Sequence, residues 1–423
     1  MHRRTGPRRR PLPFLLLLAF SLLALLGTPA SAAVPSTAEA RCRASAADGD
    51  GCTHPPAIVS LGDSYISGEA GRWAGNADTG AGGTVWGTDR AAFDCVTEDS
   101  CRHDPRRVYG TTSYEGGNRC DRSDVAPITA VDYPGVPGER RFNLACSGAT
   151  TNEFTHEYAE KHEPAQIDQL KDKAREYRVK LVVVSVGGND LGFKDIVEDC
   201  AWRFLTYRYC KNGYADMRQR LDGVEEKATR TLNDLRKGMR DLGYEDEDYR
   251  LVVQSYPAAL PAGSDYRYGE TYGRYNDGGC PFYNTDSDWA RDTVVAGLTA
   301  RLRRSAAGAG AVFLDLTDAF AGHELCSKRA HQATSANSAS SPLGSQGAEW
   351  VRWIPYLKFS SLPWKSQGDQ QESLHPNAFG QQALGTCLTR LGEQLQSGTP
   401  RRTYRCDNDG RGGASGMTVT TTL

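Results

Sequence analysis

The chain has 423 residues, a formal net charge of −2 and 24% charged residues. Such a balanced charge provides no strong basic field, so we expect no nucleic acid among its partners. The length suffices for one large domain or two small ones. The twelve cysteines are even in number and contain no C-x-x-C pair. They therefore indicate disulfides formed in an oxidising compartment, not a zinc or thioredoxin-like site.

Residues 1–32 have the three-part pattern of a secretory signal peptide. Five arginines precede an apolar run from Phe14 to Leu26, and the small residues Ala30-Ser31-Ala32 follow it. The run is short for a membrane span, so we expect cleavage near Ala32 and not an uncleaved anchor. Because no later segment is apolar for long enough, we expect a secreted, extracellular protein without stable membrane insertion.

Five short apolar runs, each bounded by charges or Gly and Pro, predict buried parallel strands at 57–61, 141–145, 180–186, 250–255 and 311–316. Apolar residues at helical spacing lie between them, most clearly over 217–242, and also follow Pro376. This alternation predicts an α/β fold in which helices cover both faces of a parallel sheet. The functional site of such a sheet lies at the carboxyl ends of its strands.

The domain boundaries follow from these patterns. We expect a signal peptide at 1–32, an N-terminal extension at 33–56, one domain at 57–400 and a partly flexible C-terminal extension at 401–423. From Asp407 the sequence looks like a loose tail. Its Asp-Asn-Asp-Gly resembles part of a calcium loop, but the later bidentate glutamate is missing.

Three insertions, at 71–121, 256–288 and 323–371, interrupt the alternation. They are either binding surfaces or packed, disulfide-stapled loops, and the sequence does not separate the two readings. Twelve cysteines allow on the order of ten thousand pairings. Proximity along the chain favours pairing successive cysteines, which gives Cys42–Cys52, Cys95–Cys101, Cys120–Cys146, Cys200–Cys210, Cys280–Cys326 and Cys387–Cys406.

Polar residues and glycines follow the predicted strands. Ser64 ends Gly-Asp-Ser after the first strand, Gly148 lies in Asn-Leu-Ala-Cys-Ser-Gly after the second, and Asn189 lies in Gly-Gly-Asn-Asp after the third. His375 precedes Pro376 near the C-terminus. Each has an ordinary structural reading: a serine caps a helix, Gly-Gly-Asn-Asp forms a turn, and a lone histidine lies on the surface. Parallel strand ends converge on one edge, so we expect these residues to meet.

Together these residues fit acyl transfer. That chemistry needs a hydroxyl nucleophile and a base of near-neutral pKa, here Ser64 and His375. It also needs donors for a developing oxyanion, which the N–H groups of Ser64 and Gly148 and the amide of Asn189 offer. Asp63 and Asp190 lie inside the same motifs, and we expect them to accept backbone N–H bonds without touching substrate.

The order of these four blocks resembles the SGNH (GDSL-type) hydrolase superfamily, whose name-giving residues map to Ser64, Gly148, Asn189 and His375. The leader and the cysteine-rich insertions look like the branch of secreted bacterial esterases and lipases typified by a suberin-degrading scab esterase. The resemblance implies a flavodoxin-like three-layer α/β/α sandwich with a mainly five-stranded parallel sheet. It also implies ester hydrolysis through an acyl-enzyme on Ser64, with His375 as general base and with neither metal nor cofactor.

One position departs from the family pattern. The family places an aspartate three residues before the histidine, and this chain has Glu372 there. Glu372 is therefore the candidate for orienting His375, with Asp369 as another carboxylate nearby. Some relatives use a main-chain carbonyl instead, which leaves a Ser–His dyad, and an ordinary surface glutamate is a third reading.

The expected function is a secreted carboxylesterase or lipase acting on a small or polymeric acyl ester, and we expect a monomer. The alternatives are a phospholipase A-type or carbohydrate acyl esterase, or an inactive secreted binding protein of the same fold. The motifs describe only the acyl carbonyl, so they leave the acyl chain length and the alcohol open.

Overall fold

The computed structural model describes residues 54–73, 75–76, 93–94, 102–103, 109, 119–332, 343–354, 370–397 and 402–422. The predicted signal peptide, most of the N-terminal extension and Asp369 lie outside these residues. The predicted pairs Cys42–Cys52 and Cys95–Cys101 also lie outside them.

A seven-stranded sheet forms the centre of the fold, in the order β4-β1-β5-β6-β7-β8-β9. Every neighbouring pair is parallel except β8 and β9. The strands are β1 Pro56–Gly62, β4 Arg141–Asn143, β5 Arg178–Ser185, β6 Arg250–Gln254, β7 Val312–Asp315, β8 Thr403–Asn408 and β9 Met417–Thr421. A separate antiparallel pair consists of β2 Phe93–Asp94 and β3 Arg102–His103. All five predicted strands are present, and β8 and β9 extend the sheet.

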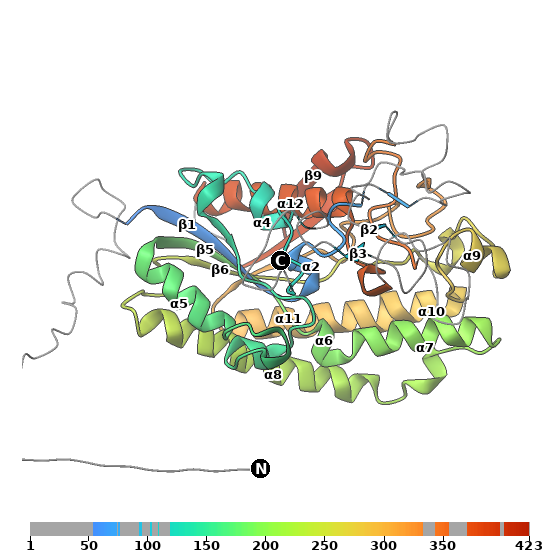
Figure 1. The fold of residues 1–423 in the computed structure, drawn as a ribbon, viewed down its shortest axis with the longest axis horizontal. Coiled ribbons are helices and arrows are strands. Elements are labelled where there is room, and N and C mark those ends of the chain that lie inside the picture. Colours follow the sequence, from blue (N-terminus) through green and yellow to red (C-terminus); the bar gives the residue numbers. More distant parts are fainter. Residues whose placement is uncertain are drawn as a thin grey trace, which may run out of the picture. The chain divides into compact units, whose positions relative to one another are not determined.

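Helices cover both faces of the sheet, which confirms the predicted three-layer α/β/α arrangement. Figure 1 shows α4 and α12 on one face and α5, α8 and α11 on the other. The α-helices are α2 Ser64–Ser67, α4 Pro127–Ala130, α5 Gln166–Glu176, α6 Gly188–Leu191, α7 Phe193–Leu205, α8 Met217–Arg240, α9 Tyr272–Asn276, α10 Asn284–Trp289, α11 Ala296–Gly308 and α12 Ala378–Gln396. The 3₁₀ helices are η3 Gly138–Arg140, η4 Thr151–Phe154, η5 Ala159–Lys161, η6 Lys211–Gly213, η7 Gly263–Asp265, η11 Gln370–Glu372 and η12 Gly413–Ser415, and the π-helical segment η8 Ala290–Val295 joins α10 to α11.

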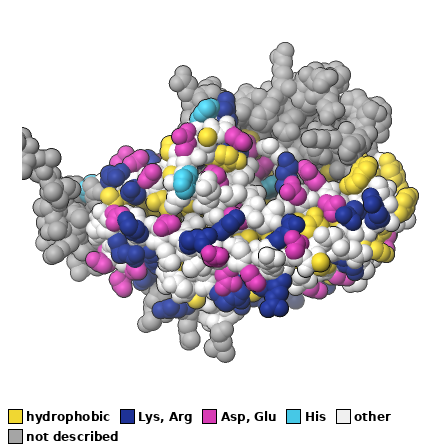
Figure 2. Space-filling model, turned by 90° about the horizontal axis from the view of Figure 1, so that it is seen from below, with side chains coloured by type: hydrophobic (Ala, Val, Ile, Leu, Met, Phe, Trp, Pro, Cys, Tyr) yellow, Lys and Arg dark blue, Asp and Glu magenta, His cyan; other side chains and the backbone are white. Residues whose placement is uncertain are grey.

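The helix predicted over 217–242 is α8, and its apolar stripe explains its position. Its buried side chains recur at steps of three and four and include Leu221, Val224, Ala228, Leu232 and Leu235. A stripe of this spacing stays on one side of a helix, so α8 packs against α11 and α5. Ion pairs bridge α8 and α11 at the surface, where Figure 2 shows basic and acidic side chains interspersed. No helix in the described ranges is long and apolar enough to cross a bilayer.

The expectation of a loose tail is wrong for residues 402–422. Tyr404 and Cys406 on β8 and Met417 and Val419 on β9 alternate inwards and are buried. Threonine, arginine and aspartate stand between them, so the segment reads as polar even though every second side chain belongs to the core. The sheet consequently has seven strands where five were expected.

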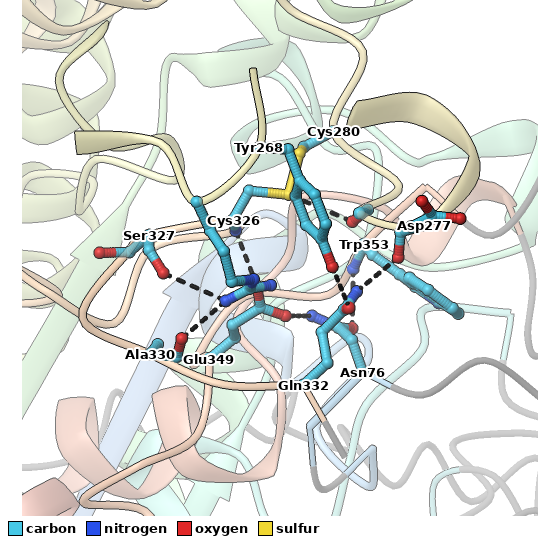
Figure 3. Close-up of polar contacts among 12 residues, drawn as sticks. Asn76, Tyr268, Asp277, Cys280, Cys326, Ser327, Ala330, Gln332, Glu349 and Trp353 are labelled. Carbon is cyan, nitrogen blue, oxygen red and sulfur yellow. Dashed lines mark hydrogen bonds and ion pairs between the residues drawn. A yellow bond between two sulfur atoms is a disulfide. The ribbon is translucent and has the colours of Figure 1, made fainter. Parts of the chain in front are cut away.

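Disulfides and one buried carboxylate hold the described parts of the insertions together. The structure contains Cys120–Cys146, Cys200–Cys210, Cys280–Cys326 and Cys387–Cys406, which are four of the six predicted pairs. Cys280–Cys326 joins the second insertion to the third. Beside it, the fully buried Glu349 accepts hydrogen bonds from Asn76 (2.6 Å) and the main-chain N–H of Cys326 (2.8 Å), which are labelled in Figure 3. It also accepts a hydrogen bond from Arg267 (2.7 Å). Residues of all three insertions thus meet at Glu349, as the packed-loop reading expects.

The Cys387–Cys406 disulfide leads to a stability prediction. It joins α12 to β8 across 19 residues, and cross-linking a loop of this size stabilises a fold by about 3 kcal/mol, chiefly through the unfolded state. The variant Cys387→Ala/Cys406→Ala should lose about that much free energy of unfolding in urea denaturation. The same pair of changes at Cys200 and Cys210 is the matched control, because it removes a disulfide that does not involve β8. If the 387/406 variant matched the wild type in unfolding free energy, β8 would not be part of the cooperative fold.

Candidate active site

Ser64 begins α2 directly after β1, yet it is not the residue that caps this helix. Asp63 is the N-cap, and its carboxylate accepts the N–H of Tyr65 at 3.1 Å. The capping explanation for a serine at this position therefore does not apply. The Ser64 Oγ lies instead 2.6 Å from Nε2 of His375, although 311 residues separate them in the sequence.

His375 lies in the loop that precedes α12, and the contacts of its two ring nitrogens identify its tautomer. Nδ1 lies 3.1 Å from the main-chain oxygen of Ser373, which can only accept a hydrogen bond. Nδ1 therefore carries the proton, and Nε2 accepts from the Ser64 hydroxyl. Burial lowers the pKa of His375 from 6.5 to about 4, so the imidazole is neutral at ordinary pH.

The expectation that the Glu372 carboxylate orients His375 is not met. Its oxygens accept the Nε1–H of Trp73 at 2.8 Å and the hydroxyl of Tyr109 at 3.3 Å. Only its main-chain oxygen contacts His375, by accepting the backbone N–H at 3.2 Å. The alternative reading, a main-chain carbonyl behind the imidazole, is the one that the Ser373 contact matches.

An unusual backbone conformation at Leu374 explains why the Ser373 carbonyl, and not the Glu372 carboxylate, lies beside the His375 ring. Leu374 has φ +62°, the left-handed region that a non-glycine residue adopts only at a cost of about 1–2 kcal/mol. Its carbonyl accepts the Tyr65 hydroxyl at 2.7 Å, and its N–H donates to the Arg352 carbonyl at 2.8 Å. The turn folds the Ser373 carbonyl back onto His375. A carboxylate three residues away in sequence is thereby aimed elsewhere.

Main-chain bonds between strand ends place two further loops beside Ser64. The N–H of Asp63 donates to Ser185 at the end of β5, at 3.1 Å. The N–H of Cys146, in the loop after β4, donates to Gly62 at 2.9 Å. Because β1 lies between β4 and β5, the loops after these strands flank the serine. This is the topological switch point of the sheet, where ligands bind in open α/β folds.

These two loops carry the expected donors, Gly148 and Asn189. One hydrogen of the Asn189 amide donates to Ala149 at 2.9 Å, which holds the two loops together and leaves the second hydrogen for a ligand. Gly148 has φ +80°, a conformation that L side chains rarely adopt, and a Cβ there would lie 2.8 Å from the Tyr158 hydroxyl, so glycine is favoured at this position. In the described part of the chain, neither the Gly148 N–H nor the Ser64 N–H donates to a protein group.

Asp63 stabilises the loops around Ser64, as expected for a residue whose carboxylate accepts hydrogen bonds from backbone N–H groups. Besides capping α2, it accepts the Tyr256 hydroxyl, which in turn accepts the Gly188 N–H at 3.1 Å. The chain Asp63–Tyr256–Gly188 thus connects the ends of β1, β6 and β5. Burial raises the pKa of Asp63 to about 7, because the carboxylate loses its hydration there.

Asp190 has the corresponding role on the neighbouring loop. It accepts the N–H and the hydroxyl of Thr151 at 2.9 and 2.7 Å and pairs with Lys227 at 3.3 Å. These bonds tie the Gly148 loop to α6. As predicted, its carboxylate accepts a backbone N–H.

The sequence analysis missed one carboxylate at this site. Glu69 is buried just after α2, and its Oε2 lies 3.6 Å from Nε2 of His375 and 2.6 Å from the Ser147 hydroxyl. It stands outside the four motif blocks, so only its closeness to Ser64 in sequence pointed to it. Across the described residues, no group of three or more His, Cys, Asp or Glu side chains is placed to hold a metal ion.

The arrangement has a definite chemical capability. A hydroxyl bonded to a neutral imidazole, beside N–H donors that have no acceptor among the described residues, is suited to attack on a carbonyl carbon. The motifs predicted acyl transfer from these residues, and their catalytic roles stay a prediction.

Comparisons with known proteins concern the family of the chain. The model of the GDSL-like Lipase/Acylhydrolase family matches residues 108–383, which include Gly148, Asn189 and His375 and begin after Ser64. The extracellular lipase of Streptomyces rimosus is 20% identical, with a TM-score of 0.40, over 77% of this chain and 94% of its own. Phospholipase A1 of Streptomyces albidoflavus is 20% identical, with a TM-score of 0.39, over 80% and 98%.

No curated protein sequence matches the chain. The family model nevertheless covers more than half of the residues. The predicted family is thus confirmed, and the scab-esterase branch stays a prediction. The chain belongs to the GDSL-like lipase/acylhydrolase family and is a hydrolase of ester bonds.

Proposed function

We propose that the protein is a secreted serine carboxylesterase or lipase with Ser64 as nucleophile and His375 as general base. The contact that carries the proposal is the 2.6 Å hydrogen bond between the Ser64 Oγ and Nε2 of His375. The leader pattern at residues 1–32 and the four disulfides support export to an oxidising compartment.

The reaction proceeds in two halves. As the Ser64 Oγ bonds to the acyl carbon, its proton moves to Nε2 of His375, and the carbonyl electron pair moves onto oxygen. His375 then returns that proton to the leaving alcohol as the tetrahedral intermediate collapses to the acyl-enzyme. Water repeats the sequence and releases the acid.

Three donors hold the oxyanion in this proposal. They are the N–H groups of Ser64 and Gly148 and the free hydrogen of the Asn189 amide. Their support is positional, since the loops after β4 and β5 flank Ser64 and the Asn189 amide is fixed on Ala149. Donors that are already aligned cost no reorganisation when the charge develops.

A Ser–His dyad is the proposed catalytic unit, with the Ser373 carbonyl behind the imidazole. The carbonyl keeps the proton on Nδ1 and thus keeps Nε2 free to accept the serine proton. It is neutral, however, so it does not balance the charge of an imidazolium ion as the carboxylate of a triad does.

The first prediction of this proposal concerns the serine. We expect the mature, oxidised protein to hydrolyse p-nitrophenyl esters in a series from acetyl to palmitoyl, with or without EDTA. Ser64→Ala should lower kcat by at least about 10³-fold while the near-ultraviolet circular dichroism stays unchanged. The chain-length profile separates esterase from lipase, and phospholipid and acetylated sugars test the alternatives. Equal rates for the variant and wild type would exclude Ser64 as the nucleophile.

The second prediction concerns pH. An imidazole acts as a base only above its pKa, and burial lowers the pKa of His375 to about 4. We therefore expect kcat/KM to hold from neutral pH down to about pH 5 and to fall below about pH 4. The measurement is a stopped assay on the acetyl ester, with re-assay at pH 7 to detect unfolding. A midpoint near 6.5 would contradict the proposed burial of the base.

The third prediction concerns Glu372. Replacing a triad carboxylate lowers kcat by about 10⁴-fold, but the Glu372 carboxylate contacts Trp73 and Tyr109. For Glu372→Gln we expect kcat to fall by less than about tenfold, together with a lower melting temperature from the disturbed buried contacts. A loss approaching that of Ser64→Ala in folded protein would restore Glu372 as the orienting acid.

A further inference from the structure

Glu69 is a buried carboxylate beside the proposed base, and the mechanism above gives it no role. Its exposed fraction is 1%, and its Oε2 approaches Nε2 of His375 at 3.6 Å. The Ser147 hydroxyl donates to the same oxygen at 2.6 Å, and the Gln381 amide donates to the Glu69 carbonyl at 3.3 Å. Side chain and backbone are therefore both held in place.

The proposed dyad leaves an electrostatic need unmet. When Nε2 takes the serine proton, a positive charge forms on a largely buried ring whose other nitrogen faces neutral main-chain carbonyls, among them that of Ser373 at 3.1 Å. Two other carboxylates lie nearby. Asp63 is bonded to Tyr256, and Asp121, whose charge favours the protonated ring, is bonded to Gln371 at 2.9 Å. Among the described residues, Glu69 is the carboxylate at ion-pair distance from the imidazole.

We infer that Glu69 is the positioning residue that stabilises the imidazolium form of His375, acting from the Nε2 side of the ring. The inference rests on the proposed function and deepens it. In the conventional triad the carboxylate hydrogen-bonds to Nδ1, whereas here a carbonyl occupies that place and the negative charge stands beside Nε2.

The distance of 3.6 Å suits a charge partner that does not interfere with the proton transfer. In the resting state Nε2 accepts the Ser64 proton, so it offers no hydrogen to Glu69. After transfer, Nε2 carries a proton and the ring carries a positive charge, and the contact becomes an ion pair. The inference requires Glu69 to remain a carboxylate, and the hydrogen bond that the Ser147 hydroxyl donates favours this charged form. The proton returns from Nε2 to the leaving alcohol.

The test is Glu69→Gln, which removes the charge and keeps an oxygen for the Ser147 hydroxyl. We expect kcat on p-nitrophenyl acetate to fall by about 10- to 10²-fold with KM within about threefold, because an ion pair at this distance acts on the charged state alone. Without the anion the imidazolium forms less readily. The acidic limb of kcat/KM should therefore move down by about one pH unit. A merely structural role would not move this limb.

Further variants complete the design. Glu324→Gln removes another buried glutamate, one that pairs with Arg291, and it should leave kcat and the acidic limb as in the wild type. Glu69→Asp keeps the charge and should recover at least about tenfold in kcat over Glu69→Gln. If Glu69→Gln does not fold, Ser147→Ala gives the second measurement. Loss of the hydrogen bond from the Ser147 hydroxyl leaves the Glu69 carboxylate less firmly positioned. This change should lower kcat by about three- to tenfold and move the acidic limb of kcat/KM to lower pH.

The outcomes separate this inference from the proposed function. An active wild type, an inactive Ser64→Ala and a Glu69→Gln variant with unchanged kcat and limb would overturn the role of Glu69 alone. Equal rates for the wild type and Ser64→Ala would overturn the dyad itself. A Glu69→Gln loss in which Glu69→Asp recovers nothing, with an unmoved limb, would show a packing role and would also overturn the inference.

Discussion

The main-chain bonds around the loop before α12 are the constraint on which the site depends. Leu374 is held in a left-handed conformation because its carbonyl accepts Tyr65 and its N–H donates to Arg352. The N–H of Arg352 returns a bond to the carbonyl of His375, so the third insertion pairs with the loop like a short strand. With this turn in place, Nε2 of the histidine faces Ser64 and Nδ1 faces Ser373.

The insertions therefore have a structural role that is separate from any contact with substrate. Glu349 begins the segment that pairs with the loop, and its carbonyl also accepts the amide of Asn377, the N-cap of α12. Its carboxylate is fixed by Arg267, Asn76 and the backbone of Cys326. A buried carboxylate with several donors resists movement, because breaking one bond leaves charge unsatisfied. The rigidity of the histidine loop is thus supplied by residues far from it in sequence.

Sequence patterns predicted five of the seven strands and the position of three candidate site residues after them, because both follow from local rules. Apolar runs identify parallel strands, and parallel strands bring Ser64, Gly148 and Asn189 to one edge. The side-chain direction of Glu372 was not predictable in this way. It depends on the sign of φ at Leu374, which is set by hydrogen bonds to residues in other parts of the chain. The number of residues between a carboxylate and a histidine limits how far apart they can lie. It does not determine the direction of the carboxylate side chain.

Two other features escaped for related reasons. β8 and β9 alternate buried and polar residues over short lengths, and a segment of Thr, Arg and Asp resembles a tail unless its neighbouring strand is known. Glu69 belongs to no motif block, and its importance arises only when the loop after α2 folds back over Ser147. Both the pairing of β8 and β9 and the position of Glu69 depend on long-range packing, which local sequence patterns do not predict.

Burial connects these features to the chemistry. It lowers the pKa of His375 to about 4 and raises that of Asp63 to about 7, so it moves both groups towards their neutral forms. A site built largely from neutral groups keeps the resting imidazole neutral but gives little support to the charges that form during acyl transfer. In such surroundings each fixed charge has a large effect, since little water screens it. The carboxylate of Glu69 matters for this reason, because it lies beside the nitrogen on which positive charge develops.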